Sequence, residues 1–126
     1  MNTIKRKERL MKELKNKEYR DAFVSSEIDA GVAFQIGALR KQREWSQQKL
    51  AEGANMKQER ISVLENPSNA PNINTIKKIA NAFDIGLIVR FVPISEMLKW
   101  KLNLSPESLE VSSFDQEDYF LGEICN

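Results

Sequence analysis

The sequence predicts a mainly α protein: a bundle of five short helices with an N-terminal helical extension and one β-strand near the C-terminus. Three observations support this class. Apolar residues recur at helical spacing through most of the chain, Gly, Asn and Pro separate the segments, and β-branched residues are concentrated in a single run. The 126 residues, 41% hydrophobic and 29% charged, fit one domain with appendages.

The first third of the chain predicts two helices. Residues 1–11 are too polar to pack, and we expect them to be frayed. A helix is expected from Lys12 to a break at Gly31. The next helix is expected from Val32 to Arg43, with three inward-facing residues: Phe34, Ile36 and Leu39.

The stretch "SQQKLAEGANMKQERISVLEN" predicts two short helices at a sharp angle. Ser46 is a good N-cap for a helix over residues 47–52. Asn55 tolerates the left-handed conformation that a tight turn needs, and the following helix is expected over residues 57–65. One apolar side of this pair would anchor it to the bundle: Leu50, Ala51, Ala54, Met56, Ile61 and Leu64.

A fifth helix and a strand follow the loop "NPSNAPN". Asn72 or Asn74 can cap the helix, which carries Ile76, Ile79, Ala80 and Phe83 at helical spacing. The run "GLIVRFVP" (86–93) predicts a strand. A lone strand leaves its backbone unpaired, so we expect it to pair with a second copy in a symmetric dimer. The alternative is an extended segment packed on the helices. The dimerisation residues would be Leu87, Ile88, Val89, Arg90, Phe91 and Val92.

The C-terminal part predicts a short amphipathic helix from Ile94 to Leu102, one further turn at residues 105–107 and an acidic, irregular tail. We therefore expect three regions. These are a basic N-terminal extension (1–30), a central unit of short helices with a tight turn (31–85), and a strand, short helix and acidic tail for dimerisation or interaction (86–126).

Charge is segregated along the chain. Residues 1–20 carry eight Lys and Arg against three Glu, a balance of +5, and residues 93–126 carry two Lys against seven Asp and Glu, a balance of −5. The basic end suggests a polyanion partner, and the alternative is a solvated helix face.

Several classes of function are disfavoured by composition. The chain has no His and one Cys, Cys125, so we expect no metal site, no cofactor and no enzymatic activity. No long apolar run predicts a membrane span, and the basic N-terminus lacks the apolar region of a secretory signal. The cytoplasm is the expected compartment.

The motif pair "SQQKLAE" and "MKQERISVLEN", joined by a three-residue turn, resembles a known family. Residues 34–85 look like the phage-repressor (Xre-type, lambda-repressor-like) helix-turn-helix domain. The flanks "EYRDAFVSSEIDAGVAFQIGALRKQREWSQ" and "AFDIGLIVRFVP" are similar to those of small phage, mobile-element and antitoxin-like regulators, a subgroup with a C-terminal β-strand.

The resemblance implies roles for individual residues. The first Gln after the cap, Gln47, would grip a phosphate or brace a neighbouring contact residue, and helix 57–65 would enter the major groove. Val63 would offer only a methyl contact to thymine. The expected DNA-binding residues are Gln47, Lys57, Gln58, Glu59, Arg60, Ser62, Val63, Asn66 and Arg43.

Two further features follow from the resemblance. Arg40 and Glu65 occupy the positions of a partly buried ion pair that positions the recognition helix. Glu59 departs from the family, because a carboxylate near phosphates is unfavourable. It either accepts from a cytosine N4 amine or pairs with Lys57 or Arg60, and we favour the pairing.

The expected function is a dimeric, sequence-specific repressor that binds double-stranded DNA at an inverted-repeat operator. The alternative is an antitoxin that binds a toxin protein and represses its own operon.

Overall fold

The computed structural model describes residues 3–117. Its α-helices are α1 (Thr3–Glu13), α2 (Lys17–Gln42), α3 (Gln47–Ala54), α4 (Gln58–Leu64), α5 (Ile73–Phe83) and α6 (Ile94–Leu102). Two 3-10 turns follow, η1 (Glu107–Leu109) and η2 (Phe114–Glu117). The mainly α prediction is confirmed. Cys125 and the acidic residues after Glu117 lie outside the described residues.

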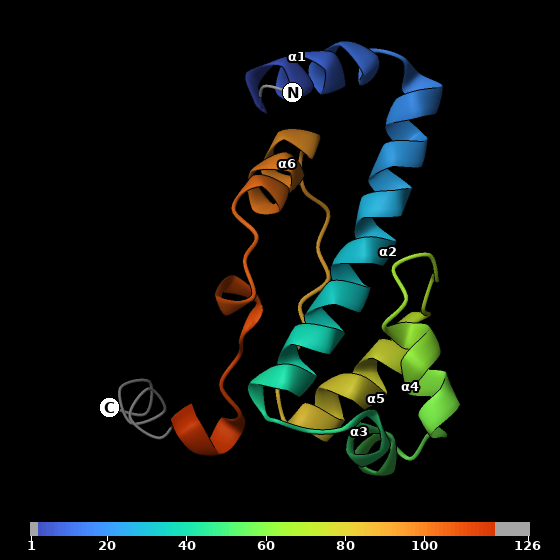
Figure 1. Cartoon of the computed structure of the whole chain (residues 1–126), viewed down its shortest axis with the longest axis vertical. Coiled ribbons are helices and arrows are strands. Elements are labelled where there is room, and N and C mark those ends of the chain that lie inside the picture. The colour runs from blue at the N-terminus through green and yellow to red at the C-terminus, as the bar shows by residue number, and fades with distance from the viewer. Residues whose placement is uncertain (1–2, 118–126) are drawn as a thin grey trace.

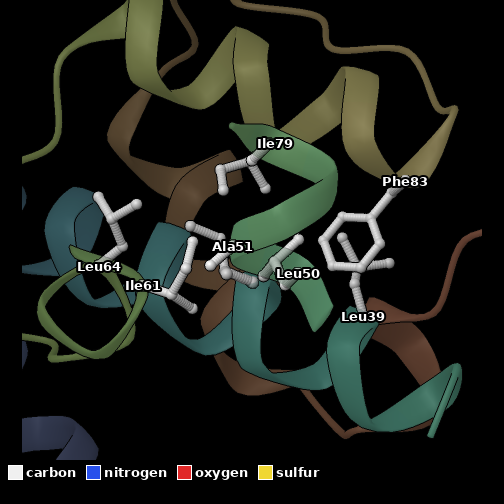
Figure 2. Packing of buried hydrophobic residues seen from close by; sticks show 9 residues of the cluster. Leu39, Leu50, Ala51, Ile61, Leu64, Ile79 and Phe83 are labelled. Atoms are coloured by element: carbon white, nitrogen blue, oxygen red, sulfur yellow. The ribbon is translucent and has the colours of Figure 1, made fainter. Parts of the chain in front are cut away.

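The core joins the C-terminal half of α2 to α3, α4 and α5 (Figure 2). Leu50, Ile61 and Phe83 are almost completely buried, and Leu64 packs beside them. The complete cluster is Ile36, Leu39, Leu50, Ala51, Ala54, Ile61, Leu64, Ile79 and Phe83. The predicted anchoring side of the two short helices is therefore confirmed.

The first two helices differ from the prediction. Residues 3–13 form a helix rather than a frayed end, because Lys, Arg and Glu are good helix formers even where nothing packs on them. No break occurs at Gly31: α2 continues through it for 26 residues, about 39 Å. A single Gly costs a helix only about 1 kcal/mol. Phe34 was also placed wrongly, since it is exposed while Ile36 and Leu39 are buried.

The predicted strand is absent from the described part of the chain. Residues 86–93 run as an extended segment beside α2 and form no β-ladder (Figure 1). A ladder needs a neighbouring strand, and residues 3–117 supply none. The alternative prediction, packing on the helices, also fails for much of this segment, because Ile88 is 85% exposed and Phe91 is fully exposed.

The molecule is elongated along α2 (Figure 1). The turn from α2 to α3 lies at one end of this helix, and α1 and α6 lie at the other end. After α6 the chain returns along α2, on the side opposite α4. We call residues 107–117 the C-terminal strap. Among the described helices, none has the length and apolar character needed to cross a membrane.

Candidate nucleic-acid interface

The turn between α3 and α4 depends on Asn55. This residue is left-handed (φ 54°, ψ 50°), and its backbone N–H donates to the carbonyl groups of Ala51 and Glu52. The N–H of Met56 also donates to Ala51, so the end of α3 is closed by a compact cap. At the other end of α3, Ser46 Oγ accepts from the N–H of Lys49 at 3.0 Å. The predicted cap and turn are confirmed.

Gln47 and Gln58 are the first residues of α3 and α4, and the turn brings them together. Gln58 Nε2 donates to Gln47 Oε1 at 2.7 Å. A glutamine amide has two N–H donors and one carbonyl acceptor, so this bond leaves Gln58 with one donor and its acceptor. Gln47 is therefore placed to hold the side chain of Gln58, which is the bracing role that the resemblance implies for it.

The outer side of α4 is polar and exposed, while Ile61 and Leu64 are buried beneath it. Val63 is the apolar exception on this side, at 40% exposure. The exposed residues at and along the helix are Lys57, Glu59, Arg60, Ser62 and Val63. All five were predicted to contact DNA, and the structure leaves all five exposed.

Glu59 does not form the ion pair that we favoured from the sequence. Neither Lys57 nor Arg60 lies within ion-pair distance of it in the part of the chain that is described. Glu59 lies in the first turn of α4, where the helix dipole favours a carboxylate. The helix dipole thus stabilises the negative charge of Glu59 without an ion pair to Lys57 or Arg60.

The orientation of α4 is fixed by Arg40 and Glu65. Arg40 Nε and Nη2 donate to the two carboxylate oxygens at 2.8 and 2.9 Å, and the side chains are only 16% and 13% exposed. Arg40 Nη1 also donates to the carbonyl of Trp45. The hydrogen bonds with Glu65 raise the pKa of Arg40, while burial acts in the opposite direction. One guanidinium thus joins α2, the turn before α3 and the end of α4.

Arg43 lies elsewhere than the DNA-binding prediction requires. Its guanidinium lies 4.8 Å from the ring centroid of Phe83 and 5.9 Å from that of Trp45, and Nη2 donates to the carbonyl of Val111 in the strap. Burial lowers the pKa of Arg43, and Asp84 partly counteracts this. The guanidinium of Arg43 lies at the edge of the core because the stacked rings of Trp45 and Phe83 attract its positive charge.

The loop after α4 is organised by its own asparagines. Asn66 Oδ1 accepts from the N–H of Ser68 at 3.0 Å, and Asn69 Nδ2 donates to the carbonyl of Val63 at 3.0 Å. Asn66 is exposed next to the end of α4, where a phosphate contact was predicted. The bracing by Asn69 was missed from the sequence, although the "NPSN" cluster is typical of such turns.

Sequence analysis also missed how α2 holds the strap. Gln42 Oε1 accepts from the N–H of Val111, and Gln35 Nε2 donates to the carbonyl of Leu109. The spacing of Gln35, Gln42 and Arg43 on one face of α2 is the signal that could have indicated this contact.

One comparison with known proteins agrees with this geometry. A family model described as helix-turn-helix matches residues 36–89. Neither the curated proteins nor the solved structures contain a match to the chain. The matched residues include all of α3, α4 and α5. Residues 36–89 therefore match a helix-turn-helix family, which supports a DNA-binding transcriptional regulator.

Proposed function

We propose that the protein is a dimeric repressor that inserts α4 into the major groove of its operator. The observation that carries this proposal is the two-sided character of α4. Ile61 and Leu64 fix it to the bundle, and a polar row beginning at Gln58 faces outward. Such a helix can meet base edges with the N-terminal residues that the α3–α4 turn positions.

Each exposed residue has a role that suits its chemistry. The free donor and acceptor of Gln58 match the N7 and N6 edge of adenine, and Glu59 can accept from cytosine N4. Val63 offers a methyl contact to thymine. Five residues are assigned to phosphates and sugars: Gln47, Lys57, Arg60, Ser62 and Asn66. Arg43 is left out of this set because of its contacts with Phe83 and Val111.

Homodimerisation is assigned to residues 87–92. This segment combines exposed β-forming side chains with backbone groups that have no hydrogen bond to another part of residues 3–117. The same segment of a second copy is a complementary partner for both features. A two-fold dimer would favour inverted repeats with half-site centres about 34 Å apart.

Substitution of Gln58 tests the assignment of α4. We expect Gln58→Ala to relax base preference at one position of each half-site and to cost about 1–3 kcal/mol at the preferred site. The measurement is selection of bound sites from random duplex DNA, followed by titration of the selected site.

Gln48→Ala is the matched control. Gln48 lies on α3 and its side chain bonds only to Glu52 among the described residues, so the same chemical change should leave base preference intact. An identical selected sequence for wild type and Gln58→Ala would contradict the proposal, as would an absence of duplex affinity at low salt.

The second candidate is an antitoxin. It is favoured by an apolar groove of about 520 Å³ between α2, α6 and the extended segment, with a lining that includes Ile88, Met97 and Trp100. Because α4 lies on the other side of α2, a protein bound there would leave the DNA-binding surface open (Figure 1). Rescue of growth when this protein is co-expressed with the product of a neighbouring toxic reading frame would support this candidate.

A further inference from the structure

Two exposed surfaces of opposite charge have no ion-pair partners within residues 3–117. Helix α1 presents Lys5, Arg6, Lys7 and Lys12, and the strap presents Glu107, Glu110 and Asp115. None of these seven side chains takes part in the ion pairs of the described chain. Charge complementarity between two surfaces favours their association.

Asp115 cannot meet α1 within one copy. Helix α1 lies at the N-terminal end of α2, which is about 39 Å long. The C-terminal part of the strap is held at the other end of α2. There Arg43 Nη2 donates to the carbonyl of Val111, and the N–H of Phe114 donates to the carbonyl of Asp84 at 3.1 Å. Asp115 is therefore separated from α1 by roughly the length of that helix.

Two-fold pairing brings these surfaces together. Residues 87–92 run along α2 from the end of α5 toward α6 (Figure 1). If this segment pairs antiparallel with itself, its start in one copy lies beside its end in the other. The C-terminal end of α2 in each copy, where the strap is held, then lies beside the N-terminal end of α2 in the partner, where α1 lies.

We propose that α1 of each copy docks against the C-terminal strap of the second copy in the dimer. This inference rests on the proposed dimer of residues 87–92 and specifies a second contact within it. The basic end and the acidic end of the chain then neutralise each other between copies. Dimerisation becomes sensitive to salt because the paired side chains are exposed.

Charge reversal tests the contact in the full-length protein. Variant A carries Lys5→Glu, Arg6→Glu, Lys7→Glu and Lys12→Glu, and variant B carries Glu107→Lys, Glu110→Lys and Asp115→Lys. Each reversal converts attraction into repulsion at both contacts of the dimer, and we expect the Kd of self-association to rise about tenfold. An equimolar mixture of A and B should form heterodimers with a Kd within about twofold of wild type, because both contacts again join opposite charges.

Sedimentation equilibrium at low and high salt gives these constants, with Lys77→Glu and Lys78→Glu on α5 as the matched control. Unchanged self-association of A and B would overturn the proposal. Recovery only when all seven substitutions are in one chain would assign the contact to a single copy and would also overturn it. A loss of duplex affinity in A without a change in self-association would assign α1 to phosphates instead.

The same preparations separate this inference from the proposed function. Phe91→Ser reports on the dimer of residues 87–92, since it removes a fully exposed aromatic side chain from that segment. If Phe91→Ser weakens self-association but A and B do not, the dimer stands and the docking is wrong. Duplex binding by the wild type at low salt tests the DNA-binding assignment independently of both.

Discussion

The two halves of α2 have the same backbone but different surroundings. Its C-terminal half contributes Ala33, Ile36 and Leu39 to the core, whereas no residue of the N-terminal half is buried. Ile28 in that half is 55% exposed. The comparison shows that a continuous helix need not lie on a continuous core. One half belongs to the bundle, and the other extends away from it.

The projecting half is stabilised by a helix cap and by ion pairs at the surface instead. Asn16 caps the helix, Lys17 pairs with Asp21 one turn later, and Lys101 of α6 pairs with Glu27 at 2.6 Å. Contacts of this kind are exposed and each contributes less than about 1 kcal/mol. The bundle, by contrast, depends on side chains that are removed from water.

The largest expected difference comes from the same substitution in each region. Ile61→Ala removes a completely buried side chain, and we expect the free energy of unfolding to fall by about 3 kcal/mol. Ile28→Ala should lower it by less than about 1 kcal/mol, because that side chain is half exposed already. Urea unfolding followed by circular dichroism measures both. Equal losses would show that the projecting half is packed as tightly as the bundle.

A smaller difference is expected between the two inter-helix ion pairs. Glu65→Gln leaves the largely buried Arg40 without its charged partner, so we expect a loss of about 2 kcal/mol. Glu27→Gln should cost less than about 1 kcal/mol, since Lys101 is 41% exposed and water can replace the carboxylate. The same unfolding measurement separates the two. A larger loss of stability for Glu27→Gln than for Glu65→Gln would contradict the view that only the C-terminal half of α2 belongs to the core.

The smallest effects concern the helix caps. Ser46→Ala removes the cap of α3 and should lower the global stability by about 1 kcal/mol. Asn16→Ala removes an equivalent cap from α2, but its main effect should be faster hydrogen exchange in the first turns of the projecting half. Hydrogen exchange resolved by residue provides the test. A uniform increase in exchange throughout the bundle after Asn16→Ala would show that both halves unfold together.

The bundle was largely predictable from the sequence, because its signals are local. Ser46, Asn55 and the spacing of Leu50, Ile61 and Leu64 fix two short helices and the turn between them. The Arg40–Glu65 ion pair was also expected, although only from resemblance to a family.

The remaining features depend on contacts between distant segments. Nothing near Gly31 indicates that α2 passes through it, since a glycine is equally consistent with an end or an interior position. Arg43 belongs to a basic cluster in the sequence. Only the fold places it against Phe83 and Val111, 40 and 68 residues away. The strand predicted over residues 86–93 does not form, because a β-ladder needs a neighbouring strand and residues 3–117 supply none.

The position of Arg43 has a consequence for shortened forms of this protein. A version that stopped before Val111 would lose more than an acidic tail. The Arg43 guanidinium would lose the carbonyl of Val111 as an acceptor, although its Nη1 already lacks a hydrogen-bond partner among the described residues. The side chain of Val111 would also no longer cover the core cluster. The minimal stable fragment is therefore expected to extend past that valine, even though the family match ends more than twenty positions earlier.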